Sequence, residues 1–225
     1  MSGTPGQPTP QSAAVEAQLE AIREQLRRWD AGAALAELEI LLPVVPRRGR
    51  FAFNLGRQAL RTELRLAEAA FRVAVDFEPA FEHAYLNLGQ TLWNQRETQA
   101  ALGVIRDAAL RFPDNPGIQA RLGQFLLDAG VEGKEAGEAE LAFREALRLG
   151  ITDIATQFGL AEALRRQRRI PEAVAEFKIA RATAEQMVSE DTSGRVERLF
   201  RRYSFLMFGE YEQLSVQGKT GQPPG

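Results

Sequence analysis

Three polar side chains recur along the chain and have the chemistry needed to hold a polypeptide backbone. Asn54, Asn87 and Arg121 each stand immediately before a Leu-Gly pair. A side-chain amide carries both donors and an acceptor, so an asparagine can form two hydrogen bonds with an extended peptide. The row predicts a surface that grips a polypeptide. The alternative is that these groups simply form the water-facing side of a helix.

Cysteine and histidine, two residue types that often carry catalysis or bind metals, are nearly absent. The sequence has no cysteine and a single histidine, His83, which excludes disulfides, thiolate metal sites and cysteine nucleophiles. One imidazole beside Glu82 has too few ligands for zinc and no nucleophile to activate. The Gly-Lys-Thr segment at 218–220 is similar to the end of a phosphate-binding loop, but Gln213 stands where that loop requires glycine. We therefore predict no metal, no cofactor and no enzymatic activity.

The overall charge gives no general attraction to nucleic acid. Lysine and arginine number 28 against 30 aspartates and glutamates, which leaves a formal net charge of −2. A basic run, Arg-Arg-Gln-Arg-Arg at 165–169, falls at a predicted helix end, where cations meet the helix dipole and water. Nucleic acid is not an expected partner, and an acidic protein segment suits this run better.

The elements that must position the polar row follow a repeat. Its clearest copy runs from Glu82 to Asn115 and places small residues, Gly89 and Ala108, where two antiparallel helices would cross closely. Pro113 would end the second helix because proline lacks an amide hydrogen and clashes with the preceding turn. The apolar positions of this copy are Tyr85, Leu88, Leu92, Ala101 and Ile105.

Other segments repeat the same pattern with local departures. The copy upstream has a turn one residue shorter, the copy downstream has a longer turn around 130–137 and no closing proline, and the first copy lacks the Leu-Gly pair. Their shared positions are Ala34, Leu38, Leu41 and Pro46; Leu55, Gly56, Ala67, Phe71, Ala74 and Pro79; Leu122, Gly123, Ala139, Phe143 and Ala146; Leu160, Ala161, Leu164, Ala173, Phe177 and Ala180.

A bulky residue, a Leu-Gly pair, an Ala-x3-Phe step and a closing proline, recurring about every 34 residues, resemble the tetratricopeptide repeat family. The resemblance implies an all-α fold, a right-handed superhelical solenoid of stacked antiparallel helix pairs. We predict a disordered tail at 1–12 and a repeat domain at 13–187, with approximate units 15–47, 48–81, 82–115, 116–153 and 154–187. A capping helix at 188–214 and a disordered tail at 215–225 would follow.

In this family the first helix of each pair lines a concave groove, so the resemblance implies that partner-contacting residues lie on that helix. The predicted partner-binding residues are Phe53, Asn54, Arg57, Asn87, Gln90, Trp93, Arg121, Gln124 and Phe158. Further groove-facing positions are Arg61, His83, Leu86, Asn94, Asp128, Glu162 and Arg165. For Phe53, Leu86, Trp93 and Phe158, which would be apolar anchors, the alternative is core packing against the next unit.

The family's full carboxylate clamp is not present. Phe53 and Gly117 stand where the clamp has lysines, which argues against recognition of a free C-terminus.

The C-terminal segment carries more apolar residues than one packing interface needs. Val196, Leu199, Phe200, Tyr203 and Met207 form one helical stripe, and other aromatic residues fall outside it. Exposed apolar area often marks association, so we expect this helix to mediate self-association or to fold partly into the groove. The start of the chain lacks the features of a secretory signal and no apolar run is long enough to cross a membrane, so we expect a cytoplasmic protein.

Together these features predict a non-catalytic scaffold or adaptor that binds a peptide or a partner helix in its concave groove. The alternative function is a regulatory or substrate-docking module for an enzyme, or for a secretion or assembly complex, encoded separately. The two differ in whether the partner is a flexible peptide or a folded surface.

Overall fold

The structure is a computed structural model that describes residues 48–61, 63–130 and 134–188, together with isolated positions between 17 and 40. Apart from those isolated positions, the predicted first repeat lies outside the described residues, as do the predicted N- and C-terminal tails and residues 189–214 of the predicted capping helix. The stripe that contains Tyr203 and Met207 is therefore also outside them.

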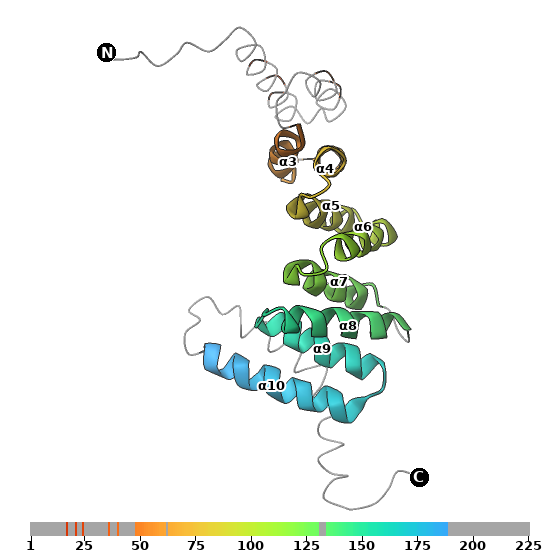
Figure 1. Cartoon of the computed structure of the whole chain (residues 1–225), viewed down its shortest axis with the longest axis vertical. Coiled ribbons are helices and arrows are strands. Elements are labelled where there is room, and N and C mark those ends of the chain that lie inside the picture. Colours follow the sequence, from red (N-terminus) through yellow and green to blue (C-terminus); the bar gives the residue numbers. More distant parts are fainter. Residues whose placement is uncertain are drawn as a thin grey trace, which may run out of the picture. The chain divides into compact units, whose positions relative to one another are not determined.

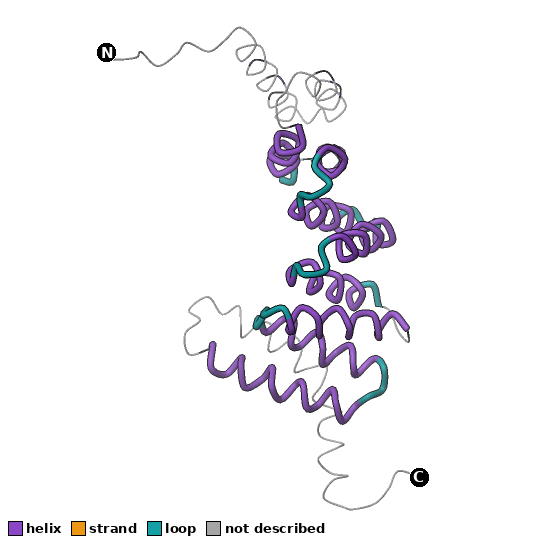
Figure 2. The backbone as a smooth tube through the Cα atoms, viewed as in Figure 1, coloured by secondary structure: helices purple, strands orange, loops and turns teal. Residues whose placement is uncertain are grey.

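Every regular element in the described part of the chain is a helix, and short loops join the helices (Figures 1 and 2). The helices are α3 (Arg48–Ala59), α4 (Leu64–Phe77), α5 (Glu82–Asn94), α6 (Thr98–Arg111), α7 (Pro116–Asp128), α8 (Lys134–Arg148), α9 (Ile154–Arg166) and α10 (Ile170–Val188). Each predicted repeat within the described residues contributes a first and a second helix, and these alternate along the chain, with α3, α5, α7 and α9 as the first helices. The described helices fall into two compact units, which divide within α6 after Ala108.

In the first unit, α4 packs against both α3 and α5. The ring of Phe71 on α4 is fully buried and lies directly against Gly56 on α3. A Cβ atom added at Gly56 would lie 2.7 Å from that ring, so only glycine permits this approach. The close crossing is the one that the Leu-Gly spacing predicts.

In the second unit, α7 packs against α8, α8 against α9 and α9 against α10. The ring of Phe143 on α8 is buried between two glycines, Gly123 on α7 and Gly159 on α9. A Cβ atom added at Gly123 would lie 2.8 Å from this ring, and one added at Gly159 would lie closer still. One aromatic ring thus joins the helix before it and the helix after it.

Helix ends in the second unit are fixed by side-chain caps. Asn115 Oδ1 accepts a hydrogen bond from the backbone N–H of Ile118 at 3.1 Å, and Pro116 occupies the first turn of α7. Asp153 Oδ1 accepts from the backbone N–H of Thr156 at 2.9 Å at the start of α9. Each cap satisfies a backbone donor that the first helical turn cannot satisfy itself.

The basic run at the end of α9 and in the following turn forms ion pairs within the chain. Arg165 and Arg166 both donate to the buried carboxylate of Glu162, at 2.7 and 2.8 Å. Arg169 pairs with Glu140 on α8 and with Glu172 on α10, each at 2.5 Å. Arg169 therefore links α8 to α10, whereas Arg165 and Arg166 form their ion pairs within the last turn of α9. Glu162, which was predicted to face the groove, is buried at 4% exposure and pairs there with Arg165 and Arg166.

Candidate functional site

The predicted polar residues on α3 are accessible. Asn54 and Arg57 are exposed on α3, one turn apart on the first helix of the pair. Phe53 beside them is 8% exposed, with its ring centroid 5.7 Å from that of Phe71 and 4.6 Å from that of Phe81. The position of Phe53 favours the core-packing alternative, because its ring fills the space between α3, α4 and the start of α5.

On α5 the predicted residues are half-buried and engage their own helix. Asn87 Nδ2 donates to the carbonyl oxygen of His83 at 2.8 Å, and Gln90 Nε2 donates to Asn94 Oδ1 at 2.9 Å. Trp93 is half-buried at the last turn of the same helix. A ligand that bound through the Asn87 amide would have to compete with this local hydrogen bond.

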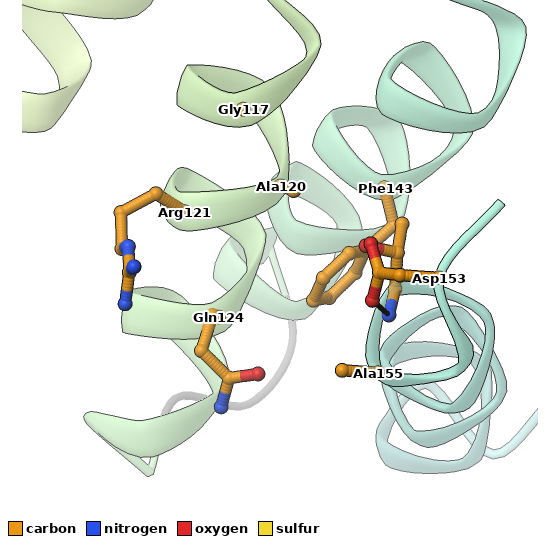
Figure 3. Close-up of a pocket in the computed structure, with 8 residues that line it drawn as sticks. Gly117, Ala120, Arg121, Gln124, Phe143, Asp153 and Ala155 are labelled. Carbon is orange, nitrogen blue, oxygen red and sulfur yellow. Dashed lines mark hydrogen bonds between the residues drawn. The ribbon is translucent and has the colours of Figure 1, made fainter. Parts of the chain in front are cut away.

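In the second unit, two predicted residues come together at an open pocket of about 270 Å³ (Figure 3). Arg121 and Gln124 reach it from α7, and the opposite wall comes from the first turn of α9. The residues that line it are Gly117, Ala120, Arg121, Gln124, Phe143, Asp153, Ala155 and Thr156. The pocket therefore lies between the first helices of two successive pairs, where the repeat pattern predicts a partner.

The walls of this pocket differ in chemistry. Phe143 forms an apolar side, and the small residues Ala120 and Ala155 leave space beside its ring. Figure 3 shows Gln124 extending toward Ala155, whereas Arg121 projects from the face of α7 away from Phe143. The guanidinium of Arg121 lies 5.7 Å from the centre of the Phe125 ring. The arrangement is a hollow lined by both polar and apolar groups, with Arg121 and Gln124 on its α7 side and the buried Phe143 ring at its base.

The carboxylate of Asp153 is held rigidly at the edge of the pocket. Besides the cap at the start of α9, Asp153 Oδ2 accepts a hydrogen bond from the Thr156 hydroxyl at 2.7 Å. Thr156 is itself buried at 3% exposure. These bonds keep the wall in place before any ligand arrives, which reduces the entropy lost on binding.

Phe158 does not reach the pocket. It is 1% exposed, and its ring centroid lies 5.4 Å from that of Phe177 on α10. As for Phe53, the structure favours core packing for this residue.

Most residues that line the pocket were not predicted from the sequence, because the predicted partner-binding residues are all polar or aromatic. Gly117, Ala120 and Ala155 have small side chains or none, and they contribute by leaving room. The signal was present in the repeat itself. Ala120 stands two residues before the leucine of its Leu-Gly pair, and the other described repeats have Phe53, Leu86 and Phe158 at this position.

A second hollow of about 190 Å³ lies within the first unit, among α4, α5 and α6. Its lining consists of Arg72, Val75, Asp76, Tyr85, Leu88, Val104 and Asp107, none of which was a predicted site residue. Nowhere in the described ranges do three or more histidine, aspartate or glutamate side chains gather as metal ligands would. The helices described there include none with the length and apolarity needed to cross a membrane.

No protein-family model and no curated protein matches the sequence significantly. Solved structures do match the fold. A tetratricopeptide repeat protein from Parabacteroides merdae ATCC 43184 gives a TM-score of 0.62 at 16% identity, over 94% of this chain and 81% of that chain. The crystal structure of MamA protein gives 0.59 at 18% identity, over 80% of this chain and 96% of that chain. PilF from Pseudomonas aeruginosa gives 0.55 at 19% identity, over 96% and 95%.

These likenesses lie below the identity at which a shared function can be read from them, but they agree on architecture. Within each unit, helices that follow one another pack together as the Leu-Gly, Ala-x3-Phe pattern predicts, and the fold matches that of the tetratricopeptide repeat protein from Parabacteroides merdae. The chain therefore has the tetratricopeptide-repeat fold.

Proposed function

We propose that this chain is a non-catalytic scaffold that holds another polypeptide against the first helices of its helix pairs. The observation that carries the proposal is the pocket between α7 and α9, where Arg121 and Gln124 stand at the rim of a hollow with both polar and apolar walls. Binding sites for organic ligands combine apolar walls with a few well-placed polar groups, and this pocket has both. The apolar wall would supply affinity, and the polar rim would fix the register of a bound backbone.

Two features favour a polypeptide over a small molecule. The pocket is open, so it would cover one side chain of a longer ligand. Exposed polar residues also recur on another first helix of the chain, where Asn54 and Arg57 stand on α3. Repeat proteins typically recognise partners through such recurring positions, each of which contributes a small part of the binding free energy.

The direct test is affinity purification of the tagged full chain followed by mass spectrometry. The double variant Arg121→Ala/Gln124→Ala removes the polar rim of the pocket, and Asn54→Ala/Asn87→Ala removes the predicted amides of the first unit. Arg148→Ala/Lys178→Ala is the matched control, because both residues are exposed on second helices and neither lines the pocket.

We expect the control to retain the partners of the wild-type chain and Arg121→Ala/Gln124→Ala to lose at least one of them. Binding of overlapping peptides from that partner would show whether it is recognised as a flexible segment or as a folded surface. Equal recovery of every partner by all three variants would refute the proposal.

A further inference from the structure

The two units of the chain contain corresponding positions that carry large side chains in the first unit and smaller ones in the second. In the first unit, the ring of Phe81 at the start of α5 is surrounded by side chains. Its centroid lies 4.6 Å from that of Phe53 on α3 and 5.9 Å from that of His83 on α5. The guanidinium of Arg50 on α3 lies over the same ring at 5.0 Å. Phe53 and Phe81 thus pack together between α3 and α5, with Phe53 next to Phe71, and the exposed side chains of Arg50 and His83 lie against the Phe81 ring.

The repeat register identifies the same four positions in the second unit. Phe53 stands two residues before its repeat leucine, as Ala120 does before Leu122. Phe81 is the residue that precedes α5, as Asp153 precedes α9.

The remaining two positions follow in the same way. Arg50 and His83 each stand five residues before a repeat leucine, as do Gly117 and Ala155. The phenylalanine of the Ala-x3-Phe step is present in both units, as Phe71 in the first and Phe143 in the second.

The four residues with smaller side chains all line the pocket of the second unit. Gly117, Ala120, Asp153 and Ala155 surround the space beside Phe143, where their counterparts place two phenyl rings, an imidazole and a guanidinium (Figure 3). The pocket is therefore the space left where the second unit lacks a cluster that the first unit has. Within the described residues, no side chain of this chain takes its place.

We propose that an aromatic side chain of the bound polypeptide fills this pocket and packs against Phe143, as Phe53 packs against Phe71 in the first unit. The first unit shows that this geometry accepts aromatic rings, at centroid distances where aromatic pairs attract. Aromatic residues that enter a preformed pocket commonly dominate binding free energy. Asp153 and Gln124 provide acceptors at the rim for the N–H of tryptophan or the O–H of tyrosine, which favours these two over phenylalanine.

This inference rests on the proposed scaffold function and specifies its ligand. Its test begins with a phage-displayed library of random peptides selected against the full chain. We expect the selected peptides to share one aromatic position, with tryptophan or tyrosine preferred. Changing that residue to alanine should weaken binding about thirtyfold or more, the effect typical of a dominant contact residue.

The decisive variant is Ala120→Phe, which places in the pocket the residue that its counterpart Phe53 already has. The fold should tolerate it, because phenylalanine occupies the same repeat position on α3 and, as Phe158, on α9. Binding of the selected peptides should fall by the same factor as on loss of their aromatic residue. Ala175→Phe is the matched control, since Ala175 is exposed on α10 and does not line the pocket, and it should leave binding unchanged.

If Ala120→Phe does not fold, Ala155→Leu fills the pocket from the opposite wall and should weaken binding in the same way. Selected peptides without a shared aromatic residue, or equal binding to wild type and to the pocket-filling variant, would overturn this inference. If such peptides still lost binding on Arg121→Ala/Gln124→Ala, the scaffold function would stand without the aromatic site. If no peptide were selected and no cellular partner were lost by the rim variant, both would fail.

Discussion

At the scale of single residues, packing in the second unit depends on the space around the Phe143 ring. Gly159 on α9 leaves no room there for a β-carbon, whereas a β-carbon at Gly103 on α6 would meet nothing within 4 Å. We expect Gly159→Ala to destabilise the chain by about 1–3 kcal/mol, the usual cost of overpacking a core. Gly103→Ala should stabilise it by about 0.5–1 kcal/mol, because alanine has less backbone entropy to lose in a helix.

Urea denaturation followed by far-UV circular dichroism measures both changes. A Gly159→Ala variant as stable as the wild type would show that α8 and α9 do not approach as closely as described.

The buried carboxylate of Glu162 gives the stability of the chain a pH dependence. Burial alone would raise the pKa of Glu162, but hydrogen bonds and positive charge from Arg165 and Arg166 lower it below the ordinary value of 4.5. Because the pKa of Glu162 is lower in the folded chain than in the unfolded chain, its ionised carboxylate stabilises the fold, and this effect is complete above the pKa of the unfolded state. This stabilisation is lost as pH falls through the folded-state pKa.

We therefore expect Glu162→Gln to lower the free energy of unfolding at pH 7 by about 1.5–3 kcal/mol, the range for hydrogen bonds to charged groups. The difference from wild type should shrink in unfolding curves measured progressively below pH 4.5. Glu97→Gln, at an exposed glutamate, should change stability by less than about 0.5 kcal/mol. A difference for Glu162→Gln that persisted unchanged at low pH would contradict the role given to its charge.

Individual residues also show how far sequence reasoning reaches. The spacing of Gly56 and Gly123 predicts close helix crossings, and the structure places both against buried phenylalanine rings. The same reasoning offered Phe53 and Phe158 as groove anchors, but both are buried. Repeat position alone does not decide exposure, because the side chains of the following helix determine whether a ring finds packing partners.

At the scale of elements, the start of α7 depends on one capping side chain. Asn115 Oδ1 accepts the backbone N–H of Ile118, a donor that the first turn of the helix leaves without a partner. Asn115→Ala should cost about 1 kcal/mol in the free energy of unfolding, whereas Asn115→Asp should retain the cap and suit the helix dipole. Chemical denaturation of the two variants side by side measures this difference. Equal destabilisation by alanine and aspartate would mean that the cap does not stabilise α7.

The helices themselves could largely be predicted, since their small and apolar positions follow the repeat. The interactions of the turn after α9 could not. The arginines at 165–169 look like a free basic patch in the sequence, yet their carboxylate partners include Glu140 from the preceding helix pair. Such pairs depend on how neighbouring helices stack, which a one-dimensional charge pattern does not contain.

At the scale of the whole molecule, the all-helical repeat architecture follows from the sequence because every unit must bury an apolar face against its neighbour. The site was harder to predict. Its polar rim, Arg121 and Gln124, could be identified by counting from each Leu-Gly pair. Its cavity could not be found in that way, because the residues that create it are defined by the large side chains they lack.

The central claim is that the face between α7 and α9 holds a polypeptide, and hydrogen–deuterium exchange of the full chain with and without a captured or selected partner tests it most directly. We predict that binding slows exchange in peptides covering 117–124 and 153–156. Exposed apolar residues also lie on second helices, with Leu141 on α8 and Ile179 on α10 at 70% and 54% exposure. Protection confined to the segments around those two residues, with the pocket segments exchanging as in the free chain, would contradict the claim.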